Sequence, residues 1–317
     1  MSSMQSIVET VFINLLKVRK NDTILIICDA KTKPIAQDFL EYGYGFGKGM
    51  LCLEIPEGKN HGQEPPKDVA QLFLGYDVLL LITSKSLSHT NARKQATKNG
   101  ARILTMPGVT KEILKRCVPV DYELIKTRNE NIAKALTKAR NVRITAPSGT
   151  DITMQLYTKH IAYEIIPHKN GGFHNLPLGE AYAPPKEGTA EGVYVVDGSH
   201  AGIGKLKHPI TIHVKNGMAV KIEGKEEAQK LKKLLNTIKD KNAFNIAELG
   251  IGTNPKAKIT GCVLEDEKVY GTCHIALGNN YSFGGKVNVP IHLDGVIRKP
   301  TIWADEKCIM KHGKLLL

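Results

Sequence analysis

The N-terminal part of the chain alternates continuous apolar runs with segments of helical periodicity. Apolar runs predict strands at 23–28, 50–55, 77–83 and 102–106, and amphipathic spacing predicts helices at 34–44, 68–74 and 90–99 between them. An amphipathic helix with apolar positions such as Ile7, Val11 and Leu15 precedes the first strand. Continuous apolar strands separated by helices are typical of a parallel sheet that is covered on both faces. We therefore predict an α/β fold that begins with a Rossmann-like parallel-sheet domain.

The pattern changes near residue 140, after a polar helical segment at 122–139. Short strands are predicted at 151–156, 191–197 and 209–214, and Asn216-Gly217 is a hairpin signal before the strand at 219–222. One helix, at 225–238, interrupts these strands. This pattern predicts two domains: residues 1–140 as the Rossmann-like α/β domain, and residues 141–317 as a strand-rich α+β domain that binds metal and carries the catalytic site.

Composition and charge narrow the classes of function. The chain has 317 residues, which is more than one hydrophobic core usually supports, and a formal net charge of +13. The lysines are spread along the chain and mix with acids on segments such as 225–233, which favours solvated helix faces over a nucleic-acid surface. No apolar run approaches the ~20 residues of a membrane helix, and the N-terminus lacks the pattern of a secretory signal. We therefore expect a cytoplasmic protein without a nucleic-acid or membrane partner.

Two features with possible chemistry have simpler explanations. The six cysteines are scattered without a C-x-x-C pair, which favours buried free thiols over disulfides. The glycine-rich run 43–49 imitates a phosphate-binding loop, but it follows a predicted helix and precedes a strand. A dinucleotide fingerprint requires the opposite order. This run is therefore predicted to be a helix end and a turn.

The C-terminal window 248–294 collects residues that bind metals. His292 and Asp294 are two apart in an apolar run, so on an extended strand both side chains leave the same face. His274 lies among small residues, which allow backbone to approach an ion or a substrate closely. Imidazole and carboxylate are the usual ligands of Zn²⁺, Mn²⁺, Co²⁺ and Fe²⁺. A single histidine beside apolar residues is more often a structural group, but a cluster of this kind marks a metal or catalytic site.

Other acids in this half of the chain have an ordinary interpretation. Glu180 follows a turn-rich loop at 170–179, and as an isolated carboxylate it is expected at a solvated rim. The consecutive acids Glu265, Asp266 and Glu267, directly before Lys268, are typical of a solvated turn. On this basis they are left outside the expected metal site.

Four motifs in order, NLPLGEAYAPP, AELGIGTNP, DEKVYGTCHIALGNNY and IHLDG, resemble the aminopeptidase T family of metallo-aminopeptidases. The resemblance covers the chain from about Gly171 to the end. It implies two divalent ions, Zn²⁺, Co²⁺ or Mn²⁺, bound by Glu180, Glu248, His274, His292 and Asp294. It also implies that Tyr281 is the active-site tyrosine, that the substrate is a peptide, and that the protein is a homodimer.

On this interpretation the protein is a hydrolase that removes N-terminal residues. The ions would activate a water molecule and polarise the scissile carbonyl, Glu180 or Glu248 would orient or deprotonate that water, and Tyr281 would bind the developing oxyanion or complete the metal shell.

Two alternatives stay open. The superfamily that the resemblance implies also includes a 2,5-dihydroxypyridine dioxygenase, which uses one ferrous ion. Its triad of two histidines and one carboxylate would fall on His274, His292 and Asp294. Retention of Glu180 and Glu248 favours hydrolysis, since such a triad does not need them. The other alternative is a binding protein with a degenerate site, which would retain no metal.

Overall fold

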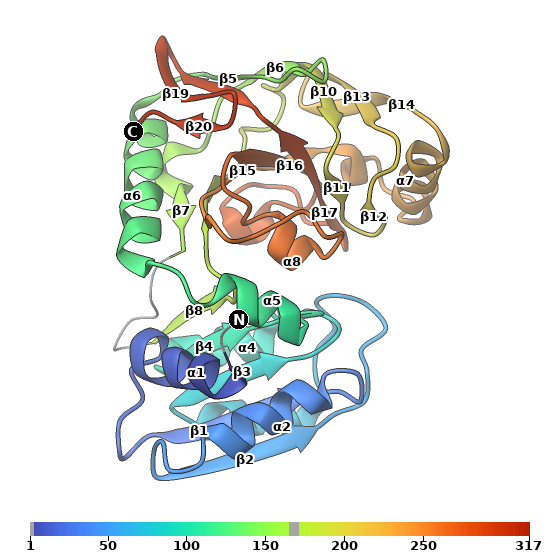
Figure 1. Cartoon of the computed structure of the whole chain (residues 1–317). Coiled ribbons are helices and arrows are strands. Elements are labelled where there is room, and N and C mark those ends of the chain that lie inside the picture. The colour runs from blue at the N-terminus through green and yellow to red at the C-terminus, as the bar shows by residue number, and fades with distance from the viewer. Residues whose placement is uncertain (1–2, 165–170) are drawn as a thin grey trace. The chain divides into compact units, whose positions relative to one another are not determined.

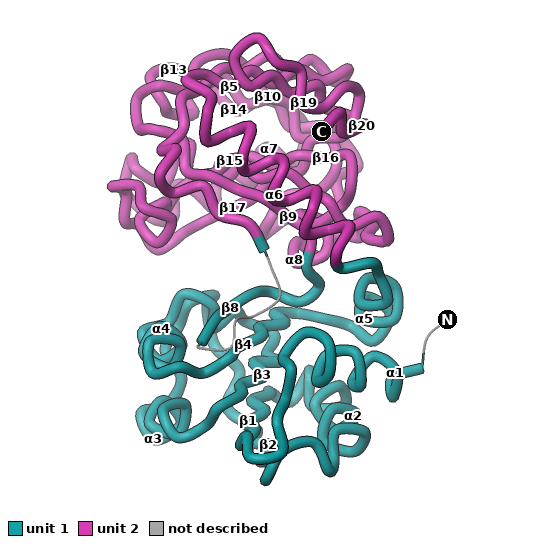
Figure 2. The backbone as a smooth tube through the Cα atoms, turned by 90° about the vertical axis from the view of Figure 1, so that its left-hand side faces the viewer, with its two compact units in different colours: residues 1–122, 164–178 teal, residues 123–163, 179–317 magenta. Residues whose placement is uncertain are grey.

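The computed structural model describes residues 3–164 and 171–317, and the chain forms two compact units (Figures 1 and 2). Unit 1 contains residues 1–122 and 164–178, and unit 2 contains residues 123–163 and 179–317. The boundary predicted near residue 140 falls inside unit 2, directly after helix α6 (Tyr122–Lys138). A single boundary cannot represent this chain, because the backbone returns once to unit 1 before it completes unit 2.

Unit 1 is built on a five-stranded parallel sheet with the order β2-β1-β3-β4-β8. The strands are β1 (Thr23–Cys28), β2 (Gly49–Glu54), β3 (Val78–Ile82), β4 (Arg102–Thr105) and β8 (Gly172–Asn175). The helices are α1 (Met4–Glu9), which continues into a π-helical turn (Thr10–Leu15), α2 (Lys33–Tyr42), α3 (Lys67–Leu72), α4 (Asn91–Lys98) and α5 (Lys111–Cys117). The predicted Rossmann-like layer is confirmed.

The continuous apolar strands are explained by helices that pack against the sheet. Val69 and Phe73, from α3 and the turn that follows it, pack with Ala96 of α4 against strand residues such as Leu25 and Leu79. Every residue of β3 is buried. Because β1, β3 and β4 have no solvated face, they do not show the alternation of a half-exposed strand. β2, at the edge of the sheet, is partly exposed.

The last strand of this sheet comes from a segment that the sequence suggested was a turn-rich loop. β8 pairs with β4 in parallel, and Asn175 accepts a hydrogen bond from Thr105 Oγ1. The ring of Phe173 packs against the α3–α4 side of the core, 4.1 Å from the guanidinium carbon of Arg93. The segment becomes a strand because the edge of β4 supplies its hydrogen bonds, which is a tertiary effect.

All six cysteines are free, as predicted, and one of them has an unusual thiol. A hydrogen bond from Cys28, with a further contribution from Lys33, lowers the pKa of Cys52 to about 7. We expect iodoacetamide to alkylate Cys52 faster than the other cysteines, at a rate that rises as the pH increases through about 7, because the thiolate is the nucleophile. Peptide mass spectrometry at several pH values measures this. In a Cys28→Ala variant the midpoint should move up toward the ordinary value of ~8.5; an unchanged midpoint would contradict the assignment.

Unit 2 consists of two antiparallel sheets. An eight-stranded sheet has the order β14-β13-β10-β6-β5-β18-β19-β20, and a seven-stranded sheet has the order β12-β11-β17-β16-β15-β9-β7. The first contains β5 (Val142–Thr145), β6 (Asp151–Met154), β10 (Glu191–Val196), β13 (Ile210–Lys215), β14 (Met218–Glu223), β18 (Thr301–Ala304), β19 (Lys307–Lys311) and β20 (Lys314–Leu315). The second contains β7 (Ala162–Tyr163), β9 (Glu180–Ala183), β11 (Ser199–His200), β12 (Gly204–Lys205), β15 (Ile246–Gly252), β16 (Thr272–Gly278) and β17 (His292–Arg298).

The helices of unit 2 are α6, α7 (Glu226–Thr237) and the short α8 (Val263–Asp266). Side chains from both sheets and from α6 and α7 form one hydrophobic core. The strand-rich α+β domain predicted for the C-terminal half is therefore confirmed. Within the described residues, no helix is long and apolar enough to cross a membrane.

Candidate metal centre

Four neighbouring strands of the seven-stranded sheet, β17-β16-β15-β9, carry the five predicted ligands on one face. Ala276 of β16 pairs with Glu248 on one side and with Asp294 on the other. Directly paired residues of antiparallel strands share a face, and so do residues two apart on one strand. His274 and His292 therefore lie on the same face as Glu248 and Asp294, and the small side chain of Ala276 leaves room between them.

The opposite face of these strands belongs to the hydrophobic core. The residues between the ligands, such as Leu249, Ile275 and Leu293, are buried in that core. This strict alternation holds the strands in register, because a shift of one residue would turn the ligands into the core. The prediction that His292 and Asp294 leave the same face of a strand agrees with this arrangement.

Gly250 makes room for the imidazole of His274. The two residues are paired across β15 and β16, and a Cβ atom at Gly250 would overlap the His274 ring. The alternation Glu248, Gly250, Gly252 thus places one carboxylate and two open positions on the ligand face of β15. The glycines of the AELGIG motif are required by space rather than by backbone conformation.

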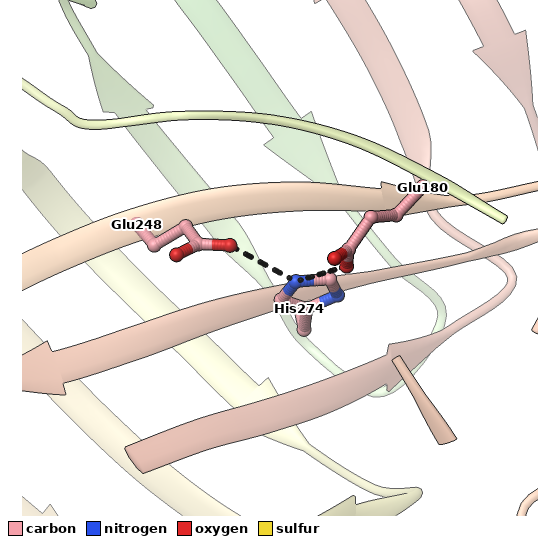
Figure 3. Close-up of side chains that lie close together, drawn as sticks. All are labelled: Glu180, Glu248 and His274. Atoms are coloured by element: carbon pink, nitrogen blue, oxygen red, sulfur yellow. Dashed lines mark ion pairs between the residues drawn. The ribbon is translucent and has the colours of Figure 1, made fainter. Parts of the chain in front are cut away.

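The five side chains form two groups that share Glu248. In the first group, His274 Nε2 lies 3.5 Å from Glu180 Oε2 and 3.4 Å from Glu248 Oε1 (Figure 3). In the second group, His292 Nε2 lies 3.3 Å from Glu248 Oε2 and 3.3 Å from Asp294 Oδ1. The two oxygens of Glu248 therefore face different groups. The triad of His274, His292 and Asp294 that a single ferrous ion was expected to use is divided between them.

These residues fit a divalent ion. Glu180 Oε2, His274 Nε2 and Asp294 Oδ1 are buried and make no hydrogen bond. Buried polar atoms without partners are costly in a protein interior, and a bound cation would satisfy them. A donor set of imidazole nitrogen and carboxylate oxygen suits Fe²⁺, Mn²⁺, Co²⁺ and Zn²⁺. Assignment of the five residues as ligands, and the identity of the metal, stay predictions.

Mutual pairing decides the pKa values in this cluster. Burial opposes the charge of His292, but Asp294 and Glu248 outweigh it and raise the pKa of His292 well above its usual range. Burial likewise opposes ionisation of Asp294, but the charge of His292, whose Nε2 lies 3.3 Å from Asp294 Oδ1, outweighs it and lowers the pKa of Asp294. The pKa of Glu248 is lowered for the same reason, because the nearby His274 and His292 outweigh burial. The carboxylates at the centre of the cluster therefore favour the ionised form that metal binding requires.

The solvated turn expected at residues 265–267 is wrong. Glu265 and Asp266 are fully buried, and Lys268 is also completely inaccessible to solvent. Lys268 Nζ donates to Glu180 Oε1 and lies 3.3 Å from Glu267 Oε2. The segment folds back over the ligand face of β15, where a Cβ atom at Gly252 would overlap Val269 O. The sequence sign of this burial is that Gly252 leaves space on β15 for the acidic segment. Patterns that consider only neighbouring residues cannot detect a relation between segments so far apart.

Glu180 is likewise not at a solvated rim: it begins β9 and its residue is 6% exposed. The pairing of β9 with β15, with Glu180 opposite Gly252, brings it to the ligand face. Its carboxylate is therefore part of the first group and not an isolated surface charge.

Tyr281 lies in a short 3₁₀ turn (Tyr281–Phe283) and is 63% exposed. Its neighbour Phe283 is the aromatic residue that approaches the cluster, with its ring centroid 5.2 Å from that of His292 and 5.7 Å from that of Tyr182. The role predicted for Tyr281 stays a prediction, and Phe283 is a candidate that the motif comparison missed.

An open hollow of about 310 Å³ lies at this edge of the cluster. It is lined by His160, Ile161, Ala162, Tyr182, Ser282, Phe283 and Gly284. Through Phe283, the lining of the hollow contacts a predicted metal ligand, His292. Its aromatic walls can stack against a flat substrate.

A family described as 2,5-dihydroxypyridine 5,6-dioxygenase matches residues 5–317. The chain belongs to this family. It is 27% identical over 256 residues to 2,5-dihydroxypyridine 5,6-dioxygenase of Pseudomonas putida, an alignment that covers 75% of this chain and 71% of that protein. The sequence comparisons thus indicate an enzyme, and they name a dioxygenase where the motifs suggested a hydrolase.

Two solved structures share the fold over nearly the whole chain. The 2,5-dihydroxypyridine dioxygenase of Pseudomonas putida superimposes with a TM-score of 0.80 at 20% identity, covering 99% of this chain and 96% of that one. AmpT from Thermus thermophilus superimposes with a TM-score of 0.71 at 16% identity, covering 99% of both chains. At these identities the likeness is one of fold. The resemblance to aminopeptidase T is therefore supported as a structural one, whereas the family match is to the dioxygenase.

Proposed function

We propose that this protein is an iron-dependent dioxygenase that opens the ring of a hydroxylated heteroaromatic compound. The observation that carries the proposal is the family match, which extends from residue 5 to residue 317 and so includes every candidate ligand. The activity named for the relative from Pseudomonas putida supplies the substrate class.

The group of Glu248, His292 and Asp294 would hold the ferrous ion, with Glu248 in place of a second histidine. An Fe²⁺ ion with three protein ligands has open positions at which O₂ and a ring hydroxyl can meet. The partly exposed side of the group is at His292, whose side chain is 22% exposed, whereas the other ligand side chains of the cluster are below 10%. Substrate would therefore enter at His292, where Phe283 and the hollow lie.

The surrounding side chains have defined tasks in this proposal. Phe283 and Tyr182 bind the flat ring and keep water away from it. Glu180 Oε2, which makes no hydrogen bond, accepts the proton of the substrate hydroxyl. Lys268 holds the other oxygen of Glu180, so the free oxygen points toward His274 and the cluster.

The second candidate is a two-ion aminopeptidase with Zn²⁺, Co²⁺ or Mn²⁺, and one observation favours it. The two oxygens of Glu248 face separate groups of three ligands, as a carboxylate that bridges two ions would. Two such ions would activate water and polarise a peptide carbonyl. Glu180 and His274 would then be ligands of the first ion rather than proton-accepting neighbours of a single iron.

One experiment separates the two candidates. Protein purified without oxygen is analysed for metal per chain by elemental mass spectrometry, beside a Glu180→Ala variant. About one iron per chain that is unchanged in the variant, with O₂ uptake and loss of ring absorbance on addition of 2,5-dihydroxypyridine, supports the dioxygenase. About two ions per chain that fall to one in the variant, with release of N-terminal residues from peptides and no O₂ uptake, would overturn it in favour of the hydrolase.

The aromatic wall offers a separate test of substrate class. Phe283→Leu should raise KM for the ring substrate about tenfold, since aromatic stacking contributes about 0.5–1.5 kcal/mol beyond buried area, and metal content should not change. Steady-state kinetics with 2,5-dihydroxypyridine measure this, and the matched control is Tyr281→Phe. If the control alone loses activity, the tyrosine role implied by the motifs is supported and the substrate pocket is placed wrongly.

A further inference from the structure

The segment that joins α8 to β16 contains the buried Lys268 and follows the buried acids Glu265 and Asp266, and the proposed chemistry does not by itself explain their burial. Glu265 and Asp266 accept hydrogen bonds from the backbone of the preceding loop: Lys258 N donates to Glu265 Oε1, and Gly261 N donates to Asp266 Oδ2. Lys268 O accepts from Asn254 N, which ties the same segment to the chain that follows β15. The backbone around Lys268 is therefore anchored on both sides.

Burial of the charged Lys268 side chain has a high free-energy cost. Its side chain is 0% exposed, and a buried lysine is rare unless it is paired. Lys268 pairs with two carboxylates beside the cluster: Glu180, to which its Nζ donates, and Glu267. Burial, and after it the charge of nearby Asp294, raises the pKa of Glu267 well above its usual range. Lys268 thus pairs with the outer carboxylate of the first group and with a second carboxylate that lies close to Asp294.

The pairing also restricts what Glu180 offers to a metal. Oε1 is occupied by Lys268, whereas Oε2 makes no hydrogen bond and lies 3.5 Å from His274 Nε2. A free carboxylate can rotate and bind an ion through either oxygen or both. Held in this way, Glu180 presents one oxygen in one direction, as ligands do when neighbouring hydrogen bonds fix them.

We propose that Lys268 is a positioning residue that fixes Glu180 for a divalent ion at the group of Glu180, Glu248 and His274. This inference rests on the proposed metal centre, and it requires that an ion can occupy this group as well as the group of Glu248, His292 and Asp294 proposed for iron. It adds a function for the acidic segment before β16, which is otherwise only a turn.

The test is a double-mutant cycle read out by metal binding. Protein stripped of metal with a chelator is titrated with Co²⁺, whose visible absorption reports its coordination, for the wild type, Lys268→Met, Glu180→Gln and the double variant. Lys268→Met should weaken Co²⁺ binding about 10- to 100-fold, the range observed when groups that orient a metal ligand are removed. The double variant should bind no more weakly than Glu180→Gln alone, because Lys268 acts through Glu180.

Folding is controlled within the same set. Lys268→Met leaves a buried carboxylate without its partner and is expected to lower thermal stability, whereas the double variant removes both members of the pair and Lys268→Arg keeps the charge. Lys268→Arg should retain more Co²⁺ affinity than Lys268→Met.

Three outcomes are decisive. Co²⁺ affinity that is unchanged in Lys268→Met, or losses that add in the double variant, overturns the positioning role. A wild type that binds no divalent ion overturns the metal centre together with this inference. A wild type that binds Co²⁺ as expected but, when loaded with Fe²⁺, consumes no O₂ with 2,5-dihydroxypyridine overturns the dioxygenase proposal and leaves the role of Lys268 supported.

Discussion

Glu248→Ala is expected to abolish divalent-ion binding to this protein, with a loss of affinity of more than about 100-fold. Glu248 is the residue that the two candidate ligand groups share, and each of its oxygens faces a different histidine. Removing any of the other four residues leaves one group with all three of its members, whereas removing Glu248 leaves neither group complete. Ligand-orienting neighbours alone contribute 10- to 100-fold to affinity, so a shared ligand should contribute more.

Elemental mass spectrometry after equilibration with Fe²⁺, Zn²⁺ or Mn²⁺ measures this effect. The matched controls are Glu180→Ala and Asp294→Ala, each of which removes a carboxylate from one group only. Glu180→Ala should retain more metal than Glu248→Ala under both candidate functions. Asp294→Ala should do so only if two ions bind, because it removes a ligand of the group proposed to hold iron. If Glu248→Ala keeps the metal content of the wild type, the centre is not where these residues place it.

Gly250→Ala is expected to damage the centre almost as severely, although glycine contributes no ligand. A Cβ atom at this position would overlap the imidazole of His274, which is held on a strand that cannot move away because its other face is in the core. The ring must therefore leave the position in which it meets Glu180 and Glu248. We expect metal affinity to fall about 10- to 100-fold, because His274 either binds an ion itself or orients Glu248, which does.

Calorimetric titration with a divalent ion gives the affinity, and thermal unfolding shows whether the fold persists. Gly49→Ala, at the start of β2, is the matched control, because a Cβ atom there meets nothing within 4 Å. That control should leave metal binding unchanged and, by restricting the unfolded chain, change stability by only about 0.4–1 kcal/mol. Equal metal affinity in Gly250→Ala and the wild type would show that His274 neither binds an ion nor orients Glu248.

Local sequence patterns predicted a feature correctly where it depends on the residues of a single strand. The apolar runs of β1 and β3 predicted a sheet covered on both faces, because each strand alone is too hydrophobic to face water. The spacing of His292 and Asp294 predicted one strand face, because side chains alternate along any strand. The motifs that resemble aminopeptidase T identified all five side chains that the structure collects.

Other features depended on segments that are far apart in the sequence. β8 is a strand only because the edge of β4 is available to it. The acids before Lys268 are buried only because the glycines of β15 leave space for that segment. Phe283, rather than Tyr281, approaches His292 because of the way the turn between β16 and β17 folds.

The sequence by itself thus determined the α/β class and the shared strand face of His292 and Asp294, since these follow from periodicity and residue chemistry within a few positions. The resemblance to aminopeptidase T, rather than local pattern, supplied Glu180 and Glu248 as candidate ligands. Only the tertiary structure decided that both histidines meet Glu248 and that each also meets one carboxylate of its own, Glu180 for His274 and Asp294 for His292. It also decided that Lys268 is buried against Glu180. The physical reason is that strand pairing sets which side chains meet across a sheet, and this pairing is fixed by packing over the whole unit rather than by neighbours along the chain.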